Sequence, residues 1–279
     1  MSAKYSLESD LKLALELSAI ADEITMARYL AQDLVVITKP DNTPVTDADR
    51  ATEEALRKHL AIVRPEDGLV GEEFGNENKE AARYWVIDPI DGTKNFMRGV
   101  PIWATLIALV EVNSSGVEEV IVGVVSAPAL SRRWSAARGL GAYVRFYSHD
   151  EMNEDLDTNE SLEKRIKVSK VSTISDASIS YSDFVGWGSR LEPFQKMLNS
   201  AWRTRAIGDF WSHMLVAEGS IDVAIEPSLA VWDMAALEII VRESGGIFTD
   251  ISGHNGPFGS SAISTNGLLH NEVVNGVNP

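Results

Sequence analysis

The chain has 279 residues, a formal net charge of −16 and no cysteine. This acidic balance argues against sequence-independent binding to nucleic acid, which depends on basic surface patches. The start of the chain lacks the cationic and then apolar pattern of a signal peptide, and no apolar run approaches the ~18 residues of a membrane helix. With the zero cysteine count, these features predict a cytoplasmic protein without a membrane partner. The length suits one large domain or two tightly joined lobes.

The first half of the chain alternates helix and strand. Apolar residues at helical spacing predict a helix over 7–28, and a second helix is expected to start at Thr46 or Asp47, with one of them as cap, and to stop before Pro65. Asp49 then lies in its first turn, where a carboxylate also suits the helix dipole. Strands are predicted at 68–72, 85–90, 104–112 and 119–127, with a hairpin turn at 113–116.

The second half of the chain, after an acidic tract at 149–160, also contains both helices and strands. That tract starts like a calcium loop but lacks the glycine and final glutamate that such a loop needs, so we interpret it as a solvated loop between lobes 1–145 and 146–279. The segment 139–144 lacks the third glycine of a dinucleotide fingerprint and is interpreted as a turn between strands. Further strands are predicted at 178–182, 221–226 and 262–265, and further helices at 190–199, 209–219 and 232–244.

The most informative segment is WVIDPIDGTKNF, residues 85–96. Asp88 and Asp91 lie at the exit of a short apolar strand, which Pro89 is expected to end, and Gly92 and Thr93 start a probable helix. Hard divalent cations take oxygen ligands, and a helix N-terminus offers unpaired N–H groups to a phosphate. Two acids beside a turn are also common in ordinary solvated loops, and this alternative stays open on the segment alone.

Two further acids lie at element ends elsewhere in the chain. Glu72 follows the apolar pair Leu69 and Val70, and Asp233 opens an amphipathic run that ends at two glycines. Four carboxylates held close together would raise one another's pKa values or bind cations. Two divalent cations would balance the four negative charges. A third cation would leave a net positive charge, which would attract a phosphate dianion.

The chain resembles the inositol monophosphatase family, the lithium-sensitive, Mg2+-dependent phosphomonoesterases. The resemblance rests on VTDADRATE (45–53), GEEFG (71–75), WVIDPIDGTKNF (85–96) and WDMAALEIIVRESGG (232–246). It implies a mixed α/β fold, a layered αβαβα sandwich. It also implies one Mg2+ held by Glu72, Asp88 and the carbonyl of Ile90, a second held by Asp88, Asp91 and Asp233, and a third, weaker ion near Glu72. Mn2+ is an alternative metal.

The same resemblance implies the other parts of the reaction centre. The amides of Gly92 and Thr93 would contact the phosphate, and Thr93 with Asp49 would orient and deprotonate the attacking water. A two-metal mechanism of this kind needs no protein nucleophile. The lack of cysteine excludes a cysteine-phosphatase mechanism, and an aspartyl-phosphate mechanism is disfavoured because the segment 47–51 fails the required motif at its last position.

Substrate choice is expected to depend on the segments around Arg205, Gly208, Asp209 and Glu226, which in the family surround the leaving alcohol. A carboxylate beside the aromatic residues 210 and 211 suits a cationic group with an apolar ring face. Alternatively, Asp209 only caps the following helix and the two aromatic residues belong to the core.

Beyond these segments the chain resembles the actinobacterial histidinol-phosphate phosphatase branch of the family. This resemblance covers the chain almost end to end, including IGDF (207–210) and LVAEGSIDVAIEP (215–227). It implies hydrolysis of the small metabolite L-histidinol phosphate in histidine biosynthesis by a cytoplasmic homodimer. Two alternatives stay open: a broader inositol or sugar monophosphatase, and a non-catalytic regulatory protein that uses the same fold as a binding surface.

Overall fold

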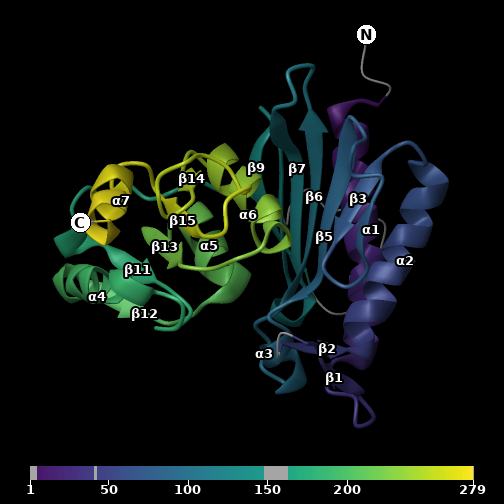
Figure 1. Cartoon of the computed structure of the whole chain (residues 1–279), viewed down its shortest axis with the longest axis horizontal. Coiled ribbons are helices and arrows are strands. Elements are labelled where there is room, and N and C mark those ends of the chain that lie inside the picture. The colour runs from purple at the N-terminus through teal and green to yellow at the C-terminus, as the bar shows by residue number, and fades with distance from the viewer. Residues whose placement is uncertain (1–4, 41–42, 148–162, 279) are drawn as a thin grey trace.

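The computed structural model describes residues 5–40, 43–147 and 163–278. Helices and sheets alternate in layers, with α1 and α2 outside the larger sheet, α5 and α6 between the two sheets, and α4 and α7 outside the smaller sheet (Figure 1). The predicted mixed α/β sandwich is therefore confirmed. The acidic tract at 149–160 lies outside the described residues. Among the described residues, no helix combines the length and the apolar character needed to span a membrane.

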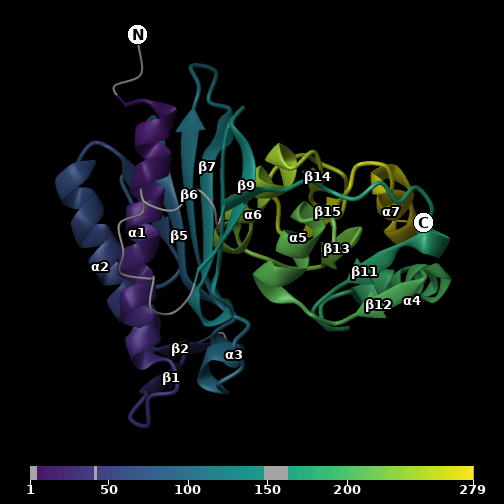
Figure 2. The ribbon, with the colours of Figure 1, turned by 180° about the vertical axis from the view of Figure 1, so that it is seen from behind.

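The outer helices of the larger sheet are α1 (Leu7–Arg28) and α2 (Asp47–Val63). Both were expected, and Thr46 rather than Asp47 is the cap of α2. The Thr46 hydroxyl accepts from the amides of the first turn, and the Asp49 carboxylate accepts from the Thr46 amide, so the two residues form a capping box. The apolar faces of these helices pack on the sheet in one buried cluster. Figure 2 shows both helices on this face of the sheet.

The larger sheet has eight strands in the described part of the chain, in the order β10-β9-β8-β7-β6-β5-β3-β4. Only β3 and β5 pair in parallel. The expected hairpin joins β6 and β7. The bounds are β3 (Gly68–Gly71), β4 (Gly75–Glu77), β5 (Arg83–Asp91), β6 (Ala104–Val112), β7 (Glu118–Ala127), β8 (Arg132–Ala137), β9 (Gly141–Phe146) and β10 (Glu163–Arg165).

The prediction that Pro89 ends its strand is wrong, because β5 continues to Asp91. The pairing of β5 with β6 shifts register between Asp88 and Asp91, so Pro89 lies in an irregular stretch where its missing N–H breaks no regular ladder bond. Its carbonyl accepts the Thr105 hydroxyl at 2.8 Å. The irregularity keeps both acids at the end of the strand.

The middle helices α5 (Asp209–Ala217) and α6 (Val231–Glu243) lie between the sheets, and apolar residues of both sheets join them in one buried cluster. The smaller sheet has the order β12-β11-β13-β15-β14. Its strands are β11 (Ser178–Ser180), β12 (Arg203–Arg205), β13 (Val223–Glu226), β14 (Ile247–Thr249) and β15 (Ala262–Thr265). The outer helices are α4 (Leu191–Ser200) and α7 (His270–Val277).

Small elements gather at one end of the larger sheet. The hairpin of β1 (Val36–Thr38) and β2 (Pro44–Thr46) lies beside the short helix α3 (Thr93–Met97), as Figure 1 shows. Three short 3-10 helices complete the described elements: Pro128–Leu130, Ile174–Asp176 and Gly188–Arg190. The end of β5, α3 and the start of α2 therefore meet in one region.

Candidate active site

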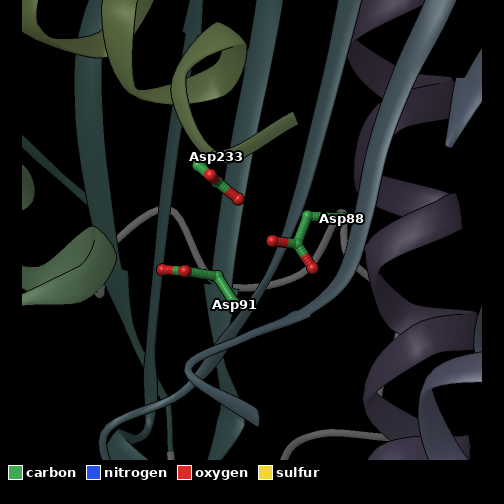
Figure 3. Close-up of side chains that lie close together, drawn as sticks. All are labelled: Asp88, Asp91 and Asp233. Carbon is green, nitrogen blue, oxygen red and sulfur yellow. The ribbon is translucent and has the colours of Figure 1, made fainter. Parts of the chain in front are cut away.

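Three carboxylates converge where β5 ends and α6 begins. Asp88 and Asp91 come from the end of β5, and Asp233 lies in the first turn of α6. One oxygen of each lies within 4.8 Å of the others, and the three side chains lie close together in Figure 3. The sequence placed these three acids around one ion, and the fold brings them together.

Backbone amides fix the orientation of each member of this cluster. The Ile90 amide donates to Asp88 Oδ1 at 3.0 Å, the Phe210 amide to Asp91 Oδ2 at 2.6 Å, and the Ala230 amide to Asp233 Oδ2 at 2.7 Å. Each carboxylate keeps further lone pairs for another ligand. Because Phe210 belongs to α5, the cluster depends on three separate elements.

Without a bound cation, burial and mutual repulsion make the ionised form of these three carboxylates unfavourable. Burial, reinforced by neighbouring negative charges, raises the pKa of Asp88 and of Asp91 well above the usual range. Burial raises the pKa of Asp233 to about 7. Oxygen-only donors under this electrostatic stress fit a hard divalent cation, which would lower all three pKa values again.

Glu72, expected among the same metal ligands, is not a member of this three-carboxylate group. It follows β3, and Lys39 Nζ lies 2.8 Å from its Oε1 and 2.5 Å from Glu73 Oε1. The negative charge of Glu72 still raises the pKa values of Asp88 and Asp49, so it contributes to the same electrostatic field. The sequence analysis missed Lys39, because no local pattern around it points to Glu72.

Thr93 and Asp49, the predicted water-activating pair, are brought together by α3 and α2. Thr93 Oγ1 lies 3.2 Å from Asp49 Oδ1 and 3.0 Å from the carbonyl oxygen of Ile90. Asp49 Oδ2 accepts the Thr46 amide at 2.8 Å and the Thr46 hydroxyl at 2.5 Å. Burial raises the pKa of Asp49 to about 6. Asp49 thus serves the capping box and contacts Thr93 as well, so the two interpretations of this residue coexist.

Gly92 is required by the turn between β5 and α3. Its φ is +86°, in the left-handed region, and a Cβ there would lie 2.9 Å from the carbonyl oxygen of Ile102. Such a contact is too short for a real side chain, so any other residue would displace the turn. The turn therefore fixes where the amides of Gly92 and Thr93 can lie.

Two of the residues predicted for the leaving group, Asp209 and Glu226, both contact Ser182. Glu226, at the end of β13, accepts the Ser182 hydroxyl on Oε1 at 2.8 Å, and the Asp209 amide donates to the same hydroxyl at 3.3 Å. The Asn95 side-chain amide donates to Asp209 Oδ2 at 2.9 Å. Burial raises the pKa of Asp209 to about 6 and that of Glu226 to about 8. Sequence reasoning missed Asn95 and Ser182; Asn95 lies in the segment 85–96, whereas Ser182 had no signal.

Other expectations for this region have mixed outcomes. Phe210 is fully buried in the core, as the alternative interpretation expected. Arg205 is exposed, and its guanidinium donates to the adjacent carbonyl of Thr204 at 2.7 Å; no described contact joins it to Asp209 or Glu226. His213 is buried with its Nδ1 2.6 Å from Ser264 Oγ, so it is a packed histidine.

A layered α/β fold with a buried carboxylate cluster beside a Thr–Asp pair defines a metal-dependent phosphomonoesterase. Residues 6–276 match the model of the inositol monophosphatase family, and the chain belongs to this family.

Relatives found by sequence and a solved structure with a similar fold both agree with this membership. The chain is 52% identical over 272 residues to a histidinol-phosphatase of Mycobacterium tuberculosis, covering 96% of this chain and 98% of the relative. It is 51% identical over 273 residues to a histidinol-phosphatase of Streptomyces coelicolor, covering 96% and 97%. A solved inositol monophosphatase of Zymomonas mobilis superimposes with a TM-score of 0.81 at 28% identity, covering 99% of this chain and all of the other.

Proposed function

We propose that this protein hydrolyses L-histidinol phosphate to L-histidinol and phosphate, with water as the nucleophile. Two nearly full-length relatives at 51% and 52% identity carry the name histidinol-phosphatase. The observation that carries the proposal is the convergence of Asp88, Asp91 and Asp233 beside Thr93 and Asp49. The family is metal-dependent, and no ion pair with a described basic residue neutralises this carboxylate cluster, which suits that chemistry.

For the metals we propose Mg2+, with Mn2+ as an alternative. Asp88, Asp91 and Asp233 would hold one ion; Glu72, Asp88 and the carbonyl of Ile90 would hold a second. A third, weaker ion would lie near Glu72. When bound, such ions lower the pKa of water and stabilise the developing charge on the leaving oxygen. Asp88 is common to both ligand sets, so it would set the spacing of the two ions.

Thr93 and Asp49 would orient and deprotonate the attacking water. The water would hydrogen-bond to Thr93 Oγ1 and give it a proton, while the hydroxyl proton of Thr93 passes to Asp49 Oδ1 across 3.2 Å. Burial raises the pKa of Asp49, and a carboxylate with a raised pKa accepts a proton more readily. The amides of Gly92 and Thr93 would hold the phosphate.

For the leaving group we propose that Asp209 and Glu226 bind the cationic amine or imidazole of histidinol, with Gly208 and Arg205 as further substrate contacts. Two acids joined through Ser182 suit a cation better than a neutral polyol. The working form would be a cytoplasmic homodimer. We also propose that 1–145 and 146–279 act as two lobes, the first with most metal ligands and the second with the leaving-group pocket and Asp233.

A broader inositol or sugar monophosphatase is the second candidate. A Thermotoga maritima relative named fructose-1,6-bisphosphatase/inositol-1-monophosphatase is 34% identical over 239 residues, covering 84% of this chain and 82% of its own length. The same metal and water machinery would serve both reactions. A purely regulatory role is disfavoured because Thr93, Asp49 and the carboxylate cluster are all present in contact geometry.

The test is phosphate release from a panel of esters with saturating Mg2+. The panel contains L-histidinol phosphate, inositol 1-phosphate, fructose 1,6-bisphosphate and 3'-phosphoadenosine 5'-phosphate. We expect kcat/KM for histidinol phosphate to exceed the others by at least about tenfold. Equal rates on histidinol phosphate and inositol 1-phosphate would favour the broader phosphatase, and no release from any ester would favour the regulatory role.

A further inference from the structure

The side chain of Asn95 connects α3 to the first residue of α5. Its Nδ2 group donates one hydrogen bond to the carbonyl oxygen of Ile102 and one to Asp209 Oδ2, both at 2.9 Å. The two hydrogens of this amide are thereby used in full. Asn95 and Asp209 are 114 positions apart in the chain, so this amide joins the proposed phosphate-binding turn to the proposed leaving-group pocket.

The backbone of Asp209 needs such support. Its φ is +49°, a conformation that non-glycine residues rarely adopt, and it follows Gly208 with φ +76°. The Asp209 amide donates to Ser182 Oγ, and the next amide, of Phe210, donates to Asp91 Oδ2. Asp209 is therefore held at its amide and at one carboxylate oxygen, which leaves a single orientation for its side chain.

The fixed orientation leaves one carboxylate oxygen for a ligand. No described residue donates a hydrogen bond to Asp209 Oδ1, and Asp209 is only partly buried. The Oδ2 edge is turned toward α3: a Cβ on Gly92 would lie 3.4 Å from it. The other acid of the pocket, Glu226, is linked through Ser182.

We propose that Asn95 is a positioning residue for substrate specificity, which presents Asp209 Oδ1 to the cationic group of the leaving alcohol. This inference rests on the proposed function. Asn95 itself does not touch the substrate: it fixes the charge that does. A carboxylate free to rotate would divide its time between orientations, and the selectivity for a cation over a neutral polyol would fall.

The experiment compares Asn95→Leu, which keeps the side-chain volume and removes the donor, with the wild-type protein. Losing a hydrogen bond to a charged group predicts a roughly tenfold fall in kcat/KM for L-histidinol phosphate, mainly through KM. For inositol 1-phosphate, whose alcohol is neutral, we expect a change below about threefold. Asn199→Leu, at an exposed position of α4, is the matched control and should change neither substrate.

A second variant, Asn95→Ser, keeps a small polar group that cannot reach both acceptors and serves if the leucine variant fails to fold. The double variant Asn95→Asp with Asp209→Asn restores the hydrogen bond with donor and acceptor exchanged. The Ile102 carbonyl loses its donor in this variant, so thermal stability should recover only in part relative to Asn95→Asp alone. The preference for histidinol phosphate should not return, because the charge has moved.

The outcomes separate the two proposals. Equal losses on both esters in the Asn95 variants, or no loss on either, overturn the positioning role while the proposed function stands. A wild-type protein without any preference for histidinol phosphate overturns the proposed function and the positioning role together.

Discussion

At the scale of single residues, Asp88 has opposite effects on activity and on stability. It is buried, and burial and the charges of Glu72, Asp91 and Asp233 raise its pKa well above the usual range. Its ionised form is therefore unfavourable in the metal-free fold and, by our proposal, necessary for both ions. Asp88→Asn should lower kcat by at least about 1000-fold at saturating Mg2+, since the shared metal ligand is lost.

The same substitution should raise the melting temperature in EDTA. A carboxyl with a raised folded pKa destabilises the fold at neutral pH, and a neutral amide removes that cost. Phosphate release and calorimetry measure the two effects, with the exposed Asp33→Asn as the control. Near-native turnover would show that the metal ligands have been placed wrongly.

Thr93 offers a second prediction at this scale. Thr93→Ala removes the hydroxyl that contacts Asp49 and should lower kcat by about 100- to 1000-fold, with Mg2+ affinity unchanged, because only water activation is disturbed. Thr93→Ser keeps the hydroxyl and should retain most of the rate. A loss of Mg2+ affinity with normal saturated turnover would instead mean that Thr93 has a structural role.

At the scale of elements, the turn before α5 depends on Gly208. A Cβ at this position would lie 2.7 Å from Ser182 Oγ, so Gly208→Ala must shift the start of α5 and with it the Phe210 amide that orients Asp91. We expect kcat to fall about tenfold and the free energy of unfolding to fall by about 1–3 kcal/mol.

Gly116→Ala is the matched control for this substitution. Gly116 has nearly the same φ, +77° against +76°, but no atom lies within 4 Å of the added Cβ. The control therefore places a side chain at a positive φ without the close contact and should leave kcat unchanged. Equal losses of activity in the two variants would contradict a special role for the α5 turn.

Long elements were predictable from the sequence because their apolar pattern repeats many times. The helix predicted at 7–28 and the strand predicted at 104–112 have these bounds in the structure. Short edge strands such as β4 and β12 are exposed or nearly so and carry no such pattern. Pro89 misled the analysis because local propensity cannot show that an irregular pairing accepts a proline.

The candidate site was predictable to a similar extent. Acids within one local segment, such as Asp88 and Asp91, could be found because a strand end places them together. The family resemblance pointed to Thr93 with Asp49, which are distant in the chain. Distant contacts that the resemblance does not assign could not be predicted, because no local pattern encodes them: Lys39 with Glu72 and Asn95 with Asp209 are the examples.

At the scale of the whole molecule, the buried His213 makes stability depend on pH. Burial lowers its pKa to about 4, against about 6.5 in an unfolded chain. Because protonation favours the unfolded state, the contribution is fully present above about pH 6.5 and is lost as pH falls toward 4. The free energy of unfolding should thus fall by about 2 kcal/mol between pH 7 and pH 5 on account of this residue.

Urea unfolding of the wild-type protein and of His213→Gln at both pH values, in EDTA, measures this effect. The buried carboxylates with raised pKa values change stability in the opposite direction as pH falls, but they do so in both proteins. The difference between the two pH responses therefore reports His213 alone. Identical responses would contradict a neutral, buried histidine.

The position of α5 and α6 between the two sheets links the stability of the whole protein to the concentration of its metal ion. Asp91 is oriented by the first turn of α5, Asp233 belongs to the first turn of α6, and both helices are packed between the two sheets. Ions bound at this junction would act as a clamp on the shared core, and any ligand that binds only the native state adds RT ln(1 + [L]/Kd) to its stability. Depletion of the metal would then expose the chain to proteolysis as well as stop turnover, so the cellular amount of the enzyme would follow the supply of its cation.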